Sequence, residues 1–415
     1  MKPDGPNRNP STQKKNGPSF FILHPASFFL RLLSYCPRPA TSNFAKSAWR
    51  TYSMVAALVV LWAIFAYVTD STFLTARNFS NLMRQTTITA ILAVGMLMVI
   101  VTGQIDLSVG SVVGLTGGLT AIAQAWLGWG LWASLAMGLT TGLAVGAVQG
   151  LFVAYANIPA FIVTLGGLLA WRGAIKGLSK GNTIPINLAS FKAIGQDYMP
   201  PAIGWALALL AMIALGYFMV RRHRARLRYG IVATRLGAVI LSLAWAVVLI
   251  LAFTGTLNAY AGVPIPVIIW LAVALSGAFL TQQTIFGRYL FAIGGNPEAA
   301  RLSGINLRRH LLAVFCIMGA LTGVAGIIYT ARVGAASPDA GRLLELDAIA
   351  ACVIGGASLM GGRGTVLGAC LGALFMASLD NGMSLKNVPD FTQDIVKGAI
   401  LVTAVGLDVW GRERS

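Results

Sequence analysis

Long apolar segments recur along this chain and constrain its fold more than any other feature. About twelve of them approach the ~20 residues that an α-helix needs to cross a bilayer. A backbone inside hydrocarbon must satisfy its own hydrogen bonds, so each segment is expected to be helical. The sequence therefore predicts an all-α, polytopic transmembrane helix bundle. The approximate limits of the segments are 52–69, 85–102, 108–127, 130–153, 160–178, 203–220, 234–254, 265–282, 311–329, 346–360, 364–380 and 393–409.

The charge balance fits a membrane protein. Hydrophobic residues make up 56% of the chain and charged residues 11%, while the formal net charge is +18. Lys and Arg are expected to gather in cytoplasmic loops, which explains a basic membrane protein. No basic stripe with interleaved aromatic residues lies outside the membrane flanks, so nucleic-acid binding is excluded.

The basic residues also predict the orientation of the spans. They cluster in alternate loops, which places both termini on the cytoplasmic side if the spans are even in number. Acids collect in the loops expected on the outer side. The basic set is Lys46, Arg50, Arg221, Arg222, Arg224, Arg226, Arg228, Arg288, Arg301, Arg308, Arg309, Arg412 and Arg414, and the acidic set is Asp70, Asp197, Asp339, Glu345, Asp390 and Asp394.

The first 45 residues differ from the rest. They are polar, and their one apolar patch, residues 20–33, is interrupted by His24, Pro25 and Arg31. The patch is too short and broken to span a bilayer, and no small-residue cleavage site follows a clean apolar core. We expect a disordered or surface-lying tail over 1–45 and a transmembrane domain over 46–415.

Glycine recurs at intervals of four residues in two spans. This spacing places the glycines on one helix face, where they permit close helix packing. The sequence contains no GxxxxGK[ST] motif, and its cysteines and histidines show no metal-ligand spacing, so we expect no ATPase site, metal or cofactor. The glycines are Gly138, Gly142, Gly146 and Gly150, and then Gly364, Gly368 and Gly372.

A short helix with both ends marked is predicted between two apolar runs. Asn296 can cap its first amides, Pro297 suits the first turn, and Glu298 favours the positive helix start. Gly304 can adopt the left-handed conformation that ends a helix. A helix this short is expected to pack on a partner, although an ordinary amphipathic connector stays possible. The residues between these signals are Ala299, Ala300, Arg301, Leu302 and Ser303.

Polar residues interrupt the apolar sequence at three further places, Gly103–Ser111, Asn157–Gly167 and Glu345–Ala350. Asp106, in Gly103–Ser111, either caps the next helix or lines a polar path through the membrane. Asp347 opens another span, where capping is the favoured interpretation. The candidate path residues are Gln104, Asp106, Ser108, Thr164 and Asp347.

Five blocks carry a family resemblance over residues 71–408. They are NFSNLMRQTTITAILAVGM (78–96), GQIDLSVGS (103–111), PAFIVTLGG (159–167), FGRYLFAIGGNPEAARLSGIN (286–306) and ELDAIAACVIGGASLMGGRGTVLGA (345–369). In order and spacing the chain resembles the ribose/xylose sugar permease family of bacterial ABC importers. Gln104 departs from the usual Gly or Glu, and the N-terminal tail does not match.

The resemblance implies a permease subunit in the bacterial inner membrane that carries a pentose, D-xylose first and ribose or another monosaccharide as alternatives. It implies a permease homodimer, a separate cytoplasmic ABC ATPase and a periplasmic sugar-binding protein. Residues 296–304 would be the cytoplasmic coupling helix that docks on the ATPase. Arg77, Arg332 and Arg342 would contact the binding protein, or would only anchor helix ends at the interface. An ion-coupled secondary transporter, resting mainly on Asp106, is the alternative from another class.

Overall fold

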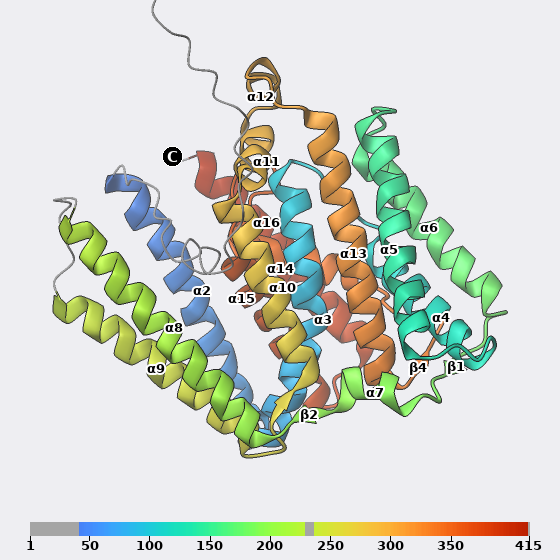
Figure 1. Ribbon diagram of the computed structural model, residues 1–415, viewed down its shortest axis with the longest axis horizontal. Helices are drawn as coiled ribbons and strands as arrows, with labels where there is room; N and C mark the ends of the chain where they lie inside the picture. The colour runs from blue at the N-terminus through green and yellow to red at the C-terminus, as the bar shows by residue number, and fades with distance from the viewer. Residues whose placement is uncertain (1–40, 229–235, 414–415) are drawn as a thin grey trace, which may run out of the picture.

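A computed structural model describes residues 41–228 and 236–413, which fold as a helical bundle (Figure 1). The predicted tail lies outside the described residues up to residue 40, and its remainder belongs to the first helix. The helices are α2 (Thr41–Val68), α3 (Ala76–Val101), α4 (Val109–Ala125), α5 (Leu131–Ala154), α6 (Ala160–Leu178), α7 (Ala189–Gln196), α8 (Pro201–Arg228), α9 (Leu236–Asn258), α10 (Ile265–Gln283), α11 (Ile285–Gly295), α12 (Pro297–Leu302), α13 (Leu307–Val333), α14 (Leu344–Ile354), α15 (Val366–Leu385) and α16 (Asp390–Glu413).

The all-α transmembrane class is confirmed. Among the described residues, eight helices are long and apolar enough to cross a membrane, and shorter apolar helices accompany them. One expected span differs: the run 346–360 is helical only from Leu344 to Ile354. A helix of that length rises about 16 Å, roughly half of a bilayer core. The glycines at 355 and 356 end it, since Gly356 has a positive φ of 86°.

Helix α3 forms the centre of the bundle. Its residues from Ile88 to Val101 are buried almost completely, apart from a small exposed part of Thr89. A helix that is apolar on all sides must be surrounded by other helices, and α3 is covered by α10, α13, α14 and α15. Figure 1 shows α3 and α13 in the middle, with α5 and α6 on one side and the α8–α9 pair on the other.

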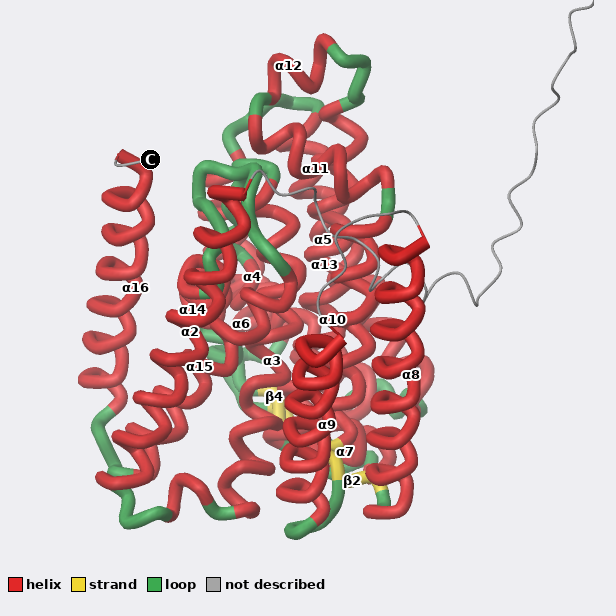
Figure 2. Tube along the Cα trace, turned by 90° about the vertical axis from the view of Figure 1, so that its left-hand side faces the viewer, coloured by secondary structure: helices red, strands yellow, loops and turns green. Residues whose placement is uncertain are grey.

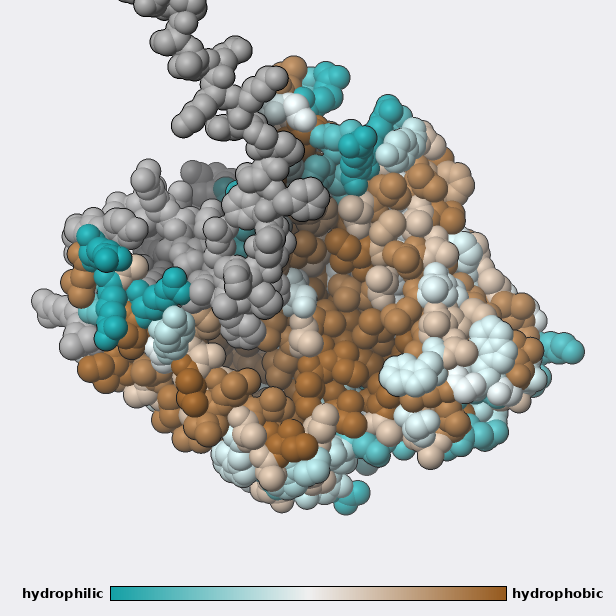
Figure 3. Space-filling model, in the orientation of Figure 1, coloured by the Kyte–Doolittle hydropathy of each residue, from teal (hydrophilic) through white to brown (hydrophobic). Residues whose placement is uncertain are grey.

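The two ends of the bundle differ in structure. Helix α12 projects beyond the other helices at one end. At the other end, two short antiparallel pairings tie the loops together: β1 (Ile184–Pro185) with β4 (Ala335–Ala336), and β2 (Tyr198–Met199) with β3 (Val263–Pro264). A broad hydrophobic surface lies between hydrophilic patches at the two ends (Figure 3), as expected of a bundle surrounded by lipid.

Glycines hold α5 against α13. A Cβ atom added to Gly142 or Gly146 would collide with the backbone of α13, and one added to Gly323 would lie 2.8 Å from the carbonyl oxygen of Gly138. Because the atoms that an added Cβ would meet belong to the backbone, rotating a side chain cannot relieve these collisions. The packing role inferred from the four-residue spacing is confirmed, and in the second ladder Gly368 and Gly372 meet the backbone of α14 in the same way.

Replacing Gly142 with leucine is expected to destabilise the bundle by about 2 kcal/mol or more, because the side chain must force α5 and α13 apart. Gly173 in α6 is the matched control, since nothing lies within 4 Å of an added Cβ there. Gly173→Leu should leave the melting temperature in detergent unchanged or slightly higher, as leucine favours helix over glycine. Equal melting temperatures for Gly142→Leu and the parent protein would contradict the packing assignment.

Candidate coupling and transport sites

Helix α12 has the ends that its sequence predicts. The Asn296 side chain accepts a hydrogen bond from the Ala299 amide at 3.0 Å, and Pro297 occupies the first turn. At the other end Gly304 has a φ of 81°, and the Ile305 amide donates to the Ala300 carbonyl at 3.1 Å. Both sets of otherwise free backbone groups are therefore satisfied locally, which lets so short a helix form.

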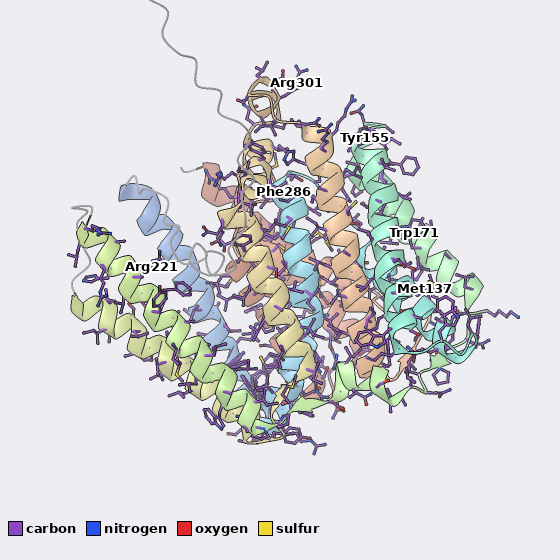
Figure 4. All side chains as sticks on the ribbon, in the orientation of Figure 1. Met137, Tyr155, Trp171, Arg221, Phe286 and Arg301 are labelled. Carbon is purple, nitrogen blue, oxygen red and sulfur yellow. The ribbon has the colours of Figure 1, made fainter. Side chains whose placement is uncertain are left out.

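The outer face of α12 is exposed and chemically mixed. Arg301 points away from the bundle at its tip (Figure 4) and pairs with Glu298 at 2.6 Å. The hydrogen bond and charge of Arg301 lower the pKa of the Glu298 carboxyl, so the pair is ionised at neutral pH. Leu302 beside them is 78% exposed. This face of α12 is therefore open to contact with a partner protein.

An aromatic cluster anchors the segment that carries α12. The Phe286 and His310 rings stack with centroids 5.6 Å apart, and Tyr289 meets the same imidazole edge-on at 5.3 Å. Phe286 and Tyr289 belong to α11, whereas His310 lies in the first turn of α13. The two arms that flank α12 are thus joined at their base, so α12 is held as a projection from a rigid support.

The break between α3 and α4 contains a buried polar network. The Ser108 amide and hydroxyl both donate to Asp106 Oδ1, at 2.9 and 2.7 Å. Gln149 of α5 donates to the Ser108 hydroxyl at 2.8 Å. The Thr164 hydroxyl of α6 lies 2.9 Å from the Ala160 carbonyl and 3.4 Å from that of Ile105. The structure therefore brings Asp106, Ser108 and Thr164 together.

Asp106 supports the start of α4 as an acceptor, although α4 itself begins after Ser108. Binding the amide two residues ahead is an Asx turn, which satisfies backbone freed by the break. Gln104 is half-buried and forms no part of this network. Sequence reasoning missed Gln149; the only signal was a lone amide in the apolar glycine-containing run of α5.

A second polar cluster joins α14, α15 and α16. Lys397 lies 3.3 Å from Asp347 and 2.9 Å from Asp380, and the side chains of Lys397 and Asp347 are 19% and 8% exposed. The capping interpretation of Asp347 is wrong. Its amide already bonds to the Leu343 carbonyl inside the helix, and its carboxylate faces Lys397 instead. Figure 2 shows α16, which supplies this lysine, along one edge of the bundle.

The three candidate docking arginines do not share one environment. Arg77 and Arg332 lie at the end opposite α12, because α3 begins there and α13 ends there, whereas Arg342 lies in the loop that leads into α14. Arg77 and Arg342 are exposed. Arg332 is half-buried, and its neighbours include Arg84 and Tyr329. Arg77 and Arg342 can meet a partner directly, whereas Arg332 is only partly accessible.

Comparison with known protein families identifies the family of this chain. The family described as "Branched-chain amino acid transport system / permease component" matches residues 78–224 and 229–405. The chain belongs to this permease family. It is a transport subunit that spans a membrane, and its matched residues include the polar break, the second polar cluster and α12.

Curated relatives of this permease include proteins named for xylose transport and proteins named for ribose import. The xylose transport system permease protein XylH of Escherichia coli K12 is 48% identical over 88% of this chain and 93% of its own length. The protein of the same name in Haemophilus influenzae is 45% identical over 88% and 97%. The ribose import permease protein RbsC of Escherichia coli K12 is 35% identical over 88% and 95%. No solved structure matches the chain.

Asp106→Asn is expected to retain more transport than Asp106→Leu. Asparagine keeps an acceptor oxygen for the amide and hydroxyl of Ser108. Leucine leaves the amide unpaired, at about 1–3 kcal/mol, and leaves the hydroxyl only the Gln149 Oε1 acceptor at 3.2 Å. Transport assays on both variants, normalised to the amount of folded permease, measure the difference. An ion-coupling carboxylate would need its charge, so equal loss in the two variants would instead favour ion-coupled transport.

Lys397→Met is expected to destabilise the permease by about 3–5 kcal/mol, because Asp347 and Asp380 lose the cation that they share in a poorly hydrated site. Adding Asp347→Asn and Asp380→Asn should recover most of the decrease in melting temperature, because no unpaired charge then remains. Lys176→Met is the control. Lys176 pairs with Asp339 at 3.0 Å, but both side chains are more than half exposed, so its loss should cost less than about 1 kcal/mol. Similar effects of the two lysine substitutions would contradict the role given to burial.

Proposed function

We propose that this permease is the transmembrane subunit of an ATP-driven importer for a pentose, with D-xylose as its substrate. The observation that carries this proposal is the 48% identity to a xylose permease over nearly the whole of both chains, against 35% to a ribose permease over the same share. Ribose or another monosaccharide is the alternative substrate within the same class. A neutral sugar requires hydrogen-bonding partners rather than a fixed charge, and the Asp106–Ser108–Gln149–Thr164 region supplies such groups.

In this proposal α12, with residues 296–304, docks on a separate cytoplasmic ABC ATPase. Its exposed leucine, its charge pair and its position beyond the bundle support a contact of this kind. Two copies of the permease form the transport unit. ATP binding to the ATPase then changes the position of α12, and the bundle responds by opening the path to one side or the other.

The opposite end of the bundle faces a periplasmic sugar-binding protein. Arg77 is exposed there, Arg332 is half-buried there, and Arg342 is exposed in the loop before α14. Exposed arginines steer an acidic partner and set its register in a salt-dependent way. The outer loops thus choose the delivery partner, and the path itself binds the sugar only weakly.

The permease lies in the bacterial inner membrane with both termini in the cytoplasm. The described start of α2 and the end of α16 lie at the end of the bundle that carries α12, which supports this orientation (Figure 1). The basic end of α8, where Arg221 is labelled in Figure 4, lies at the same end and agrees with the preference of arginine for the cytoplasmic side.

The proposal is tested by purifying the permease from cells grown on xylose and identifying bound proteins by mass spectrometry. Uptake of labelled xylose and ribose is measured in parallel, with the ion gradient dissipated and ATP maintained. Co-purification of an ATPase and uptake that survives loss of the gradient would support the proposal. Uptake that stops with the gradient would establish ion-coupled transport instead.

Exchanging the charges on α12, with Glu298→Lys and Arg301→Glu together, is expected to abolish xylose uptake. The exchange keeps an oppositely charged pair three residues apart, so the helix survives while its outward charge pattern is reversed. The matched control exchanges the other exposed pair, Lys176→Asp with Asp339→Lys, at the opposite end of the bundle. The control should retain ATPase co-purification. Normal uptake in the α12 variant would remove this helix from the ATPase interface.

A further inference from the structure

Three backbone segments meet at the base of α12. They are the end of α11 at Gly294–Gly295, the turn after α3 at Val101–Gly103, and the loop after α14 at Gly361–Gly362. The Gly362 amide donates to the Val101 carbonyl at 2.9 Å. These segments are far apart in sequence, so only the fold brings them into contact.

Glycine is required at this junction for two reasons. Gly103, Gly361 and Gly362 have φ values of 79°, 87° and 72°, which residues with a side chain rarely adopt. The segments also approach too closely for side chains. A Cβ on Gly361 would lie 2.8 Å from the Gly294 carbonyl oxygen, and one on Gly294 would lie 2.7 Å from the Gly362 amide and collide with the Val101 carbonyl.

Each segment leads to a different functional element. Gly294–Gly295 runs directly into α12. Val101–Gly103 runs into the break that carries Asp106 and Ser108. The loop with Gly361–Gly362 joins α14, which bears Asp347, to α15, which bears Asp380. The junction therefore connects α12 to both buried polar clusters.

The junction is built to transmit displacement. Contacts between backbone atoms cannot be relieved by rotating a side chain. A shift of Gly294 toward Val101 or Gly362 must therefore displace them. The loop on the α14 side is braced internally, since the Ser358 amide donates to the Arg363 carbonyl at 3.0 Å and the Gly361 amide to the Ser358 carbonyl at 2.9 Å. The contacts that join the break to α5 and α6 are side-chain hydrogen bonds, from Gln149 to the Ser108 hydroxyl and from Thr164 to the Ile105 carbonyl.

We propose that Gly103, Gly294, Gly361 and Gly362 form a transmission junction that passes the movement of α12 to the break between α3 and α4. The junction and the break move together relative to α5 and α6. This movement changes the hydrogen-bond partners of Ser108 and Thr164. This proposal rests on the proposed function, because it takes ATPase docking on α12 as the source of the movement. These glycines act as positioning residues and do not contact the sugar.

Gly294→Ala and Gly295→Ala form a matched pair that tests the junction. They are adjacent in α11, but nothing lies within 4 Å of a Cβ added to Gly295. Both variants are reconstituted with the ATPase and the binding protein. Gly294→Ala should keep the ATPase bound and hydrolysing at its basal rate. Its sugar-stimulated hydrolysis and xylose transport should fall about tenfold, within the range usual for allosteric coupling. Gly295→Ala should remain within about twofold of the parent protein.

A distance measurement decides the case if Gly294→Ala does not fold. Spin labels are placed at Gln104 and Ser303, or at Gln104 and Tyr155, in a permease whose four native cysteines are replaced. On ATP binding to the complex, the Gln104–Ser303 distance should stay constant while the Gln104–Tyr155 distance changes. Movement of Ser303 relative to Gln104 would overturn the junction.

The two proposals fail in different ways. If an ATPase co-purifies and the folded Gly294→Ala variant transports as well as Gly295→Ala, the junction is wrong and the ATP-driven importer stands. If no ATPase binds the parent permease and ATP changes neither distance, the proposed function itself is wrong.

Discussion

The absence of water in the hydrocarbon core is the constraint on which the rest of the structure depends. Backbone amides and carbonyls there must find partners within the protein, and continuous helices are the simplest solution. Helix α3 is the extreme case, since its buried half is apolar on every side. Wherever a helix stops inside the bundle, other groups must replace the lost bonds. At the break after α3 this is done by Asp106 and by the backbone of Gly362.

Glycine serves two purposes in this bundle. Between α5 and α13 it brings two regular helices into backbone contact, which strengthens packing where there is no hydrophobic drive between helices. At the base of α12 it permits three irregular segments to meet with positive φ angles. The first arrangement makes one side of the bundle rigid. The second joins the exposed tip to the interior, so that a force applied at α12 can reach a polar site.

Charge is placed according to how well water can reach it. Glu298 with Arg301, and Lys176 with Asp339, are exposed pairs that contribute little to stability. Lys397 and Asp347 are largely buried and Asp380 is 32% exposed, so these three charges depend on one another more than the exposed pairs do. The Lys397 cluster links α14, α15 and α16, because each of these helices supplies one of its three charged side chains.

The sequence by itself determined the helical class, the course of most spans, both ends of α12 and the contact face of α5. Each depends on signals within one segment: apolar length, caps next to the helix they end, or glycines four residues apart. Only the tertiary structure decided that Asp347 pairs with Lys397, that Gln149 joins Asp106 and Ser108, that α14 is a half-length helix, and that Gly294 meets Val101 and Gly362. Those features depend on contacts between residues far apart in the chain, and no local pattern states which distant backbone or charge will lie opposite a given residue.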